Sequence, residues 1–291
     1  MLKRLAKLFP KDVSRNTFTE RGKGISLSLG GIVSELKAKE LLPEDEKQKD
    51  ALIEALAMRV GGKYTEPLEI IAPVCPDYSE DGIGHGIGRE AVGAMKATRM
   101  ILDIFRNITR DAIKLKIRIL IADTEDDIPE IIERSARNDI RFYQNCCRDS
   151  AIAIDNGLNE ESRNTTSVHT FSDFLGVAFR ETQYRFESLI KGMMSGDDRL
   201  RHEISDISSR RGKKYHSLLG RPEKSNELTI RYMAQYAALA YLMRKRSPPP
   251  LIMNYGTPNL DYLNAFQKHE RLRLPDEPET ILSVISYPVD R

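Results

Sequence analysis

Hydrophobic and polar positions follow two different spacings along this chain, and the change between them predicts the order of its elements. Leu68 to Val74 is a continuous apolar run interrupted only by Glu69, and Ile117 to Ala122 is a second run of the same kind. Short runs without alternation are typical of strands covered on both faces, as in a parallel sheet. Between them, apolar residues from Arg89 to about Leu115 recur at helical spacing. Strand, long helix and strand form a βαβ unit, which joins parallel strands.

Helical spacing also recurs outside this unit. It predicts helices in these segments: two between residues 32 and 58, and one each over 129–155, 171–194 and 228–243. Two more strands are expected at Leu251–Tyr255 and Ile281–Tyr287. Residues 1–31 are polar and hold several glycines, and residues 157–167 are rich in Asn, Ser, Thr and Glu. We expect an N-terminal arm and an exposed loop in those two places.

This order of elements predicts an α/β fold with a Rossmann-like, mostly parallel sheet flanked by helices. Residues 1–66 form an N-terminal arm and helices, and residues 67–291 form the α/β domain. That domain includes a helical region over residues 130–245, which is an insertion or cap. The pattern leaves open whether this region covers the sheet or caps its edge.

Composition limits the class of protein. The 291 residues are 40% hydrophobic and 30% charged, and no apolar run approaches the roughly 20 residues that span a bilayer. Lys7 and Pro10 interrupt the start of the chain before a signal-peptide core can form. The three cysteines, which include the adjacent Cys146 and Cys147, form neither an even disulfide framework nor a metal-finger spacing. We expect a cytoplasmic protein without a membrane partner, and we expect Cys146 and Cys147 to be core residues.

Polar residues follow the two predicted strands at the edge where ligands bind in open parallel sheets. Asp77 and Tyr78 come shortly after the first strand and offer an acid and a phenol to a substrate amine or hydroxyl. Asp123 directly follows the second strand. His85, in its cationic form, would favour a thiolate at Cys75, although an isolated cysteine is more often a packing residue. The candidate catalytic residues are therefore Asp77, Tyr78, His85 and Asp123.

A glycine-rich segment connects the first strand to the long helix. Gly84, Gly86 and Gly88 would let backbone amides approach an anion at a helix start, next to Arg89. Gly86-x-Gly88-x-x-Ala91 is a variant of the dinucleotide fingerprint, but the connection is longer than that tight turn and Asp123 lies beyond the usual spacing of about 20 residues. The pattern favours an anion-binding lid over a nicotinamide site. A hinge that contacts no ligand is the alternative.

Asp123 and Glu125 share one side of an extended segment, because alternate residues point the same way. Such a pair would bind Mg²⁺ or Mn²⁺ with a nucleotide diphosphate. Asp126 and Asp127, with Pro129 after them, are instead typical of a helix start. The cofactor is otherwise unknown from the sequence.

Two further patterns concern partners and a histidine. The formal net charge is only +2, but one segment concentrates basic residues: Arg199, Arg201, Arg210, Arg211, Lys213, Lys214 and Arg221. This basic segment is a hypothetical tRNA or RNA contact, and the alternative is a solvated helix and loop. His169 and Asp173 lie four residues apart, as on one helix face, without a zinc-protease motif, which favours a structural histidine.

The order of these motifs resembles the isocyanide synthase family, enzymes that convert an amino acid's amine into an isonitrile with a pentose phosphate. The resemblance rests on Pro73-Val74-Cys75-Pro76, Ser79, the glycine segment and the strand ending in Asp123. Phe171 to Val177 also resembles a family phrase, which in that family directly follows the second strand, and the lysine and asparagine expected after the first phrase are absent. The phrase from Pro73 to Ser79 also resembles bacterial proteins of unknown activity.

The leading functional hypothesis is a Rossmann-like transferase or synthase. Its substrate would be a small phosphate-bearing or amino-acid-derived molecule. The alternatives are a metal-dependent nucleotide-sugar transferase, an RNA- or tRNA-binding protein, and a ligand-binding protein without catalysis.

Overall fold

The computed structural model describes most of the chain, and every structural statement below concerns those parts. They are residues 29–43, 46–60, 66–74, 89–109, 113–123, 141–219, 222–255, 274–276 and 283–287. Side chains are not described for residues 89–91, 141–146, 210–219, 222–225, 228, 254–255, 284 and 286–287.

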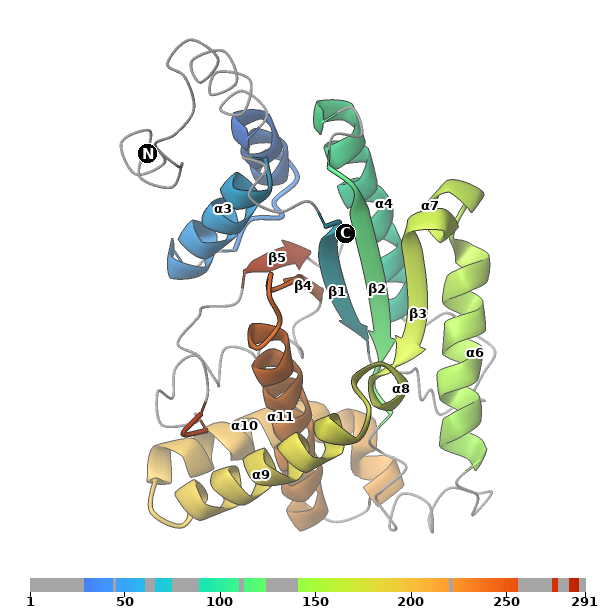
Figure 1. Cartoon of the computed structure of the whole chain (residues 1–291). Coiled ribbons are helices and arrows are strands. Elements are labelled where there is room, and N and C mark those ends of the chain that lie inside the picture. The colour runs from blue at the N-terminus through green and yellow to red at the C-terminus, as the bar shows by residue number, and fades with distance from the viewer. Residues whose placement is uncertain are drawn as a thin grey trace.

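Five parallel strands form one sheet (Figure 1). They are β1 (Leu68–Val74), β2 (Leu115–Ile121), β3 (Thr166–Thr170), β4 (Leu251–Tyr255) and β5 (Val284–Tyr287). Their order across the sheet is β3-β2-β1-β4-β5. β1 and β2 pair in register from Leu68 with Leu115 to Val74 with Ile121. This parallel pairing confirms the expected parallel sheet. The two apolar runs lie side by side near its centre.

The helices are the segment over residues 29–38 and eight labelled elements in Figure 1. These are α3 (Glu46–Val60), α4 (Arg89–Thr109), α6 (Arg141–Gly157), α7 (Glu160–Thr165), α8 (Phe171–Leu175), α9 (Val177–Met194), α10 (Asp198–Leu219) and α11 (Pro222–Arg244). No helix within the described ranges combines the length and apolarity needed to cross a membrane.

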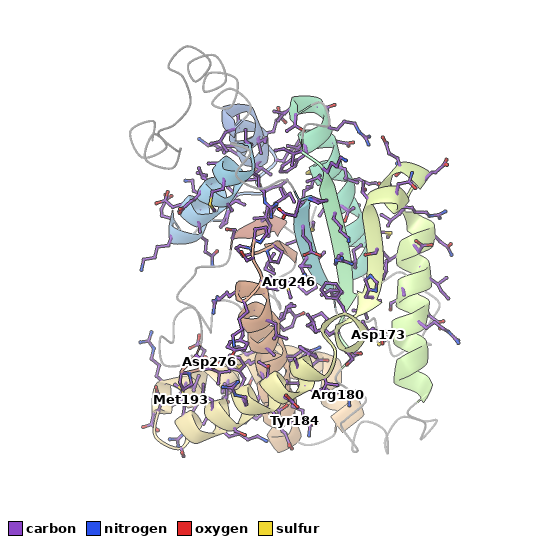
Figure 2. The ribbon with its side chains drawn as sticks, in the orientation of Figure 1. Asp173, Arg180, Tyr184, Met193, Arg246 and Asp276 are labelled. Carbon is purple, nitrogen blue, oxygen red and sulfur yellow. The ribbon has the colours of Figure 1, made fainter. Side chains whose placement is uncertain are left out.

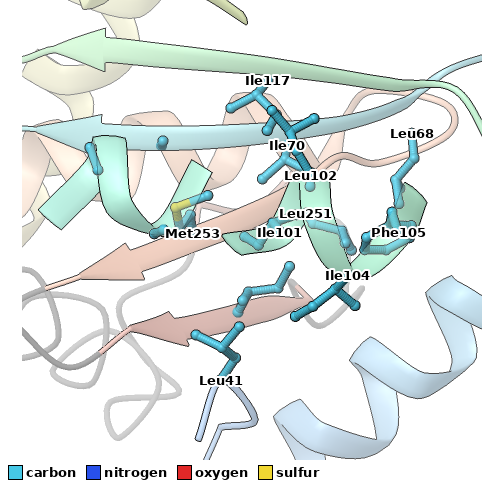
Figure 3. Packing of buried hydrophobic residues seen from close by; sticks show 14 of the residues in the cluster. Leu41, Leu68, Ile70, Ile101, Leu102, Ile104, Phe105, Ile117, Leu251 and Met253 are labelled. Carbon is cyan, nitrogen blue, oxygen red and sulfur yellow. The ribbon is translucent and has the colours of Figure 1, made fainter. Parts of the chain in front are cut away.

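One buried cluster joins the sheet to α4, α3 and the helix over residues 29–38. Ile70 and Leu251 from the sheet meet Ile101 and Phe105 of α4 in this cluster (Figure 3). Alternate residues of β1 belong to it, since Leu68, Ile70, Ala72 and Val74 point to the same face of the sheet. Burial of this amphipathic face of α4 gives the long helix its fixed place against the strands.

A second buried cluster lies on the other face of the sheet. It contains Ile71, Leu120 and Ile252 together with aromatic residues of α9 and α11, among them Phe179 and Tyr236. Figure 1 shows α9, α10 and α11 grouped beyond the carboxyl ends of β1 to β3, with α11 running back toward the start of β4. Helices α9, α10 and α11 therefore both pack on one face of the sheet and extend past its carboxyl edge, whereas α6 contributes Cys147 and Ile154 to the cluster on the other face.

Three local expectations are wrong. Residues 157–167 are not an exposed loop: α7 begins there with Asn159 as its cap, whose side chain accepts from the Ser162 amide at 2.9 Å, and β3 follows. Among the described strands β3 pairs with β2 alone and lies at the edge of the sheet, so its polar sequence carries no buried-strand pattern. The expected helix over residues 171–194 is broken at Gly176, whose φ of 67° is outside the helical region. Leu29 is also core rather than arm, being 2% exposed.

Candidate functional site

The candidate site lies at the carboxyl edge of the sheet, near the point where the chain changes direction across it. From β1 the chain proceeds to β2 and β3 on one side, whereas β4 and β5 lie on the other side of β1. In open parallel sheets this switch point leaves a crevice between the strand-end connections, where ligands bind. The crevice expected here lies beyond the carboxyl ends of β1 and β4.

Several predicted site residues fall outside the described residues: Asp77, Tyr78, Gly84, His85, Gly86, Gly88 and Glu125. Arg89 is the first residue of α4, but its side chain is not described. The predicted pairing of Asp123 with Glu125 in a metal site thus stays a prediction. Among the described residues, no group of three histidine, cysteine or acidic side chains is arranged to hold a metal ion.

Asp123 lies where the sequence places it, immediately beyond β2. The Ala122 amide donates to the Val74 carbonyl at 2.8 Å, which continues the strand pairing by one residue and brings Asp123 to the end of β1 as well. The Ser172 amide donates to the two carboxylate oxygens of Asp123 at 3.3 and 3.4 Å. Asp123 therefore connects the central strands to the start of α8.

Burial raises the pKa of the Asp123 carboxyl above its ordinary value, because a charged carboxylate loses hydration there. Hydrogen bonds from Thr170 and Ser172 act in the opposite direction, and the negative charge of Asp173 adds to the increase in pKa. A partly buried carboxyl of this kind is suited to binding ligand hydroxyls or to holding a proton.

The start of α8 fixes this environment. Thr170 ends β3 and caps α8, since its hydroxyl accepts from the Asp173 amide at 3.1 Å. Asp173 is exposed next to this cap, as Figure 2 shows beside α8. His169 and Asp173 do not share a helix face, because His169 belongs to β3 and Asp173 to α8. The expected shared helix face of His169 and Asp173 is therefore wrong, because the sequence pattern did not predict β3.

The basic segment forms most of α10. Arg201 donates to the Asp198 carboxylate at 2.6 Å and to the Met194 carbonyl at 3.1 Å, so part of its charge is neutralised within the helix turn. Arg199 is exposed, and the segment holding Arg210, Arg211, Lys213 and Lys214 continues the helix without described side chains. The described side chains of this segment therefore neither support nor contradict the predicted contact with RNA or tRNA. Cys147 is buried at 4% exposure, in agreement with a core role, and the Cys146 side chain is not described.

Sequence reasoning missed a cluster of charged and aromatic side chains on the sheet. Glu69 of β1 accepts from Arg118 of β2 and, at 2.7 Å, from Arg246 beyond α11. The guanidinium carbons of the two arginines lie 4.7 and 4.9 Å from the centre of the Phe174 ring. The His169 ring centre is 5.7 Å from that of Phe174. The sequence does contain a sign of this cluster, because Glu69 and Arg118 are the charged residues that interrupt the two apolar runs.

A second cluster attaches residues 274–276 to the helices. Asp276 accepts from Arg185 of α9 at 3.1 Å and from Lys245 at 2.9 Å, and the Tyr241 hydroxyl of α11 also donates to it. These bonds, that of Tyr241 first, hold the pKa of the Asp276 carboxyl well below its usual range. Leu274 is buried in the core shared by α9 and α11. This arrangement holds residues 274–276 against α9 and α11.

The chain matches no protein-family model, and no curated protein sequence is significantly similar to it.

Proposed function

We propose that this protein has a Rossmann-like fold and binds a small phosphate-bearing ligand, with nucleotides as the leading class, at the carboxyl edge of its sheet beside β1, β2 and β4. The transferase or synthase activity expected from the sequence would act on that ligand or on a second substrate beside it. Asp123 would accept hydrogen bonds from ligand hydroxyls, and the glycine-rich segment before α4 would receive the phosphate.

The observation that carries this proposal is the strand order. β3-β2-β1-β4-β5 agrees with the first five strands of the Rossmann order, in which nucleotide phosphates lie over the connection after β1. In this chain that connection contains Gly84, Gly86 and Gly88 and leads into α4. Backbone amides at the start of a long helix favour an anion.

The position of Asp123 gives independent support. Nucleotide-binding sheets of this order place a ribose-binding acid at the end of the strand next to β1. Asp123 lies two residues after the end of β2, which pairs with β1 along its whole length. A carboxylate offers roughly four acceptor sites, so the hydrogen bonds from Thr170 and Ser172 leave room for a ligand hydroxyl.

Calorimetric titration with a panel of phosphate-bearing ligands tests this proposal. The panel contains nucleoside mono- and diphosphates, nucleotide sugars and a pentose phosphate, each with and without Mg²⁺ or Mn²⁺. Asp123→Asn removes the acceptor charge while keeping the shape, and Asp173→Asn is the matched control because that carboxylate is exposed at the same edge. Loss of a charge-assisted hydrogen bond costs about 1.5–3 kcal/mol, so Asp123→Asn should weaken binding by about 10- to 100-fold.

Asp173→Asn should bind at least as tightly as wild type, because it removes a negative charge near the site and leaves the Asp123 carboxylate in place. The proposal fails if wild-type protein binds nothing in the panel, or if both variants bind as tightly as wild type. Metal-dependent binding that Asp123→Asn abolishes would favour the nucleotide-sugar transferase instead. Circular dichroism of each variant checks that the sheet is intact.

A further inference from the structure

On the side of the sheet that faces α9 and α11, β3 is covered less completely by apolar residues than β1, β2 and β4 are; among the described residues, the Phe174 ring lies beside His169 there. Parallel sheets are usually buried on both faces. The cluster under α9 and α11 includes Ile71, Leu120 and Ile252, but no residue of β3. Ser167 and His169 point to that same side, because they pair with Arg118 and Leu120 in register. All five residues of β3 are only half-buried.

Among the described residues that meet Glu69 on this face, positive charge exceeds negative charge. Glu69 is shared between Arg118 and Arg246, so one carboxylate neutralises only one of two guanidinium groups. Burial lowers the pKa of His169, and the positive charge of Arg118 lowers it further. Lys116 acts in the same direction, and Asp173 acts against it.

The two guanidinium groups are held in place before any ligand arrives. Arg118 is fixed by Glu69 and by the Phe174 ring, and Arg246 is fixed by the same two residues (Figure 2 labels Arg246). Their side chains are 17% and 38% exposed, so they are partly shielded from water but still reachable. Preorganised, partly desolvated arginines are the usual recognition groups for phosphate oxygens.

Unused polar atoms lie next to these arginines. Ser167 Oγ and His169 Nε2 are buried and have no hydrogen-bond partner among the described residues. A buried polar atom without a partner is uncommon and costs free energy, which a ligand oxygen or hydroxyl can offset. Both atoms belong to β3, beside Arg118 on β2.

We propose that Arg118, Arg246, Ser167 and His169 form a binding site for a phosphoryl group on the sheet face, separate from the ligand site beside Asp123. We call it the β3-face site. A phosphoryl group carries several acceptor oxygens and up to two negative charges, which suits two guanidinium groups, a hydroxyl and an imidazole together. Phe174 supports the arginines from one side rather than contacting the anion.

Inorganic phosphate is the probe for this site, titrated at low ionic strength by calorimetry. Arg118→Gln and Arg246→Gln should each weaken phosphate binding by about tenfold or more, because each removes a charge-assisted contact. Arg106→Gln is the matched control: Arg106 is an α4 arginine that also pairs with a glutamate, Glu161, and is 40% exposed. It should bind phosphate as wild type does.

The pKa of His169, followed by NMR of its ring protons, is the second measurement. Bound phosphate should raise it, since an adjacent anion stabilises the imidazolium form. A structural ion pair alone would leave the pKa unchanged when phosphate is added. If Arg118→Gln does not fold, the more exposed Arg246→Gln carries the test.

The β3-face site is overturned if wild-type protein shows no saturable phosphate binding, or if that binding is the same in both arginine variants. It is also overturned if phosphate leaves the pKa of His169 unaltered. Asp123→Asn should not change phosphate binding at this face. Asp123→Asn therefore tests the nucleotide site and the arginine variants test the β3-face site, so the failure of either proposal can be recognised independently of the other.

Discussion

Gly176 joins α8 to α9 in a conformation that only glycine adopts readily. Its φ of 67° and ψ of −159° lie where a Cβ atom strains the backbone, at a cost of about 1–3 kcal/mol for other residues. A Cβ built there meets no atom within 4 Å, so Gly176→Ala would introduce no steric clash. The substitution should therefore measure backbone strain alone.

The expected net effect is a loss of about 1–2 kcal/mol in the free energy of unfolding. Alanine also restricts the unfolded chain, which returns about 0.4–1 kcal/mol of stability and reduces the strain penalty. Gly192→Ala is the matched control, because Gly192 lies in α9, has no positive φ and likewise has open space around a built Cβ. It should stabilise the protein by about 0.5–1 kcal/mol, since alanine is the better helix former.

Urea unfolding followed by far-ultraviolet circular dichroism measures both variants against wild type. The two free energies of unfolding should differ by about 2 kcal/mol with unchanged dependence on urea concentration. Equal stabilities for Gly176→Ala and Gly192→Ala would refute the break between α8 and α9. The start of α8, which holds the Ser172 amide against Asp123, would then need a different explanation.

Three further substitutions test the core and the two perturbed carboxyl groups. Phe171→Ala should cost about 3–5 kcal/mol in thermal or urea unfolding, because Phe171 is 0% exposed and contacts the Phe179 and Tyr236 rings edge-on; a loss below about 1 kcal/mol would contradict that packing. Asp123 has a raised pKa in the folded protein, so the folded state binds its proton more tightly; wild type should lose stability relative to Asp123→Asn as pH rises above 3.8, and pH-independent differences would disprove this. Asp276 has a lowered pKa in the folded protein, so its carboxylate should stabilise the folded state fully above pH 3.8, and this stabilisation should disappear as the pH falls through the folded-state pKa. Acid unfolding of Asp276→Asn and wild type tests whether this pH dependence is opposite in direction to that of Asp123.

The central strands were predictable from sequence because their burial leaves a continuous apolar run. β1, β2 and β4 agree closely with the predicted segments. β3 was not predictable, because an edge strand of sequence Thr-Ser-Val-His-Thr lacks that run and depends on pairing with β2. The same cause hid the environment of Asp123, whose nearest partners follow β3.

Long-range contacts account for the rest. The position of Asp123 at a strand end followed from local pattern, but the contact between Glu69 and Arg246 joins residues 177 positions apart. No local periodicity reports such a contact. The break at Gly176 was also invisible, because the apolar spacing on either side of it continues as if one helix were present.

Mass spectrometry of the small molecules that the protein retains tests the central proposal most directly. Wild type, Asp123→Asn and Asp173→Asn would each be incubated with a small-molecule extract, rapidly desalted and denatured to release bound ligand. The proposed site at the carboxyl edge predicts a phosphorus-containing molecule released from wild type and from Asp173→Asn, and strongly depleted in Asp123→Asn. Release of only phosphorus-free molecules, or of the same phosphorus-containing molecule in equal amounts from all three proteins, would contradict it.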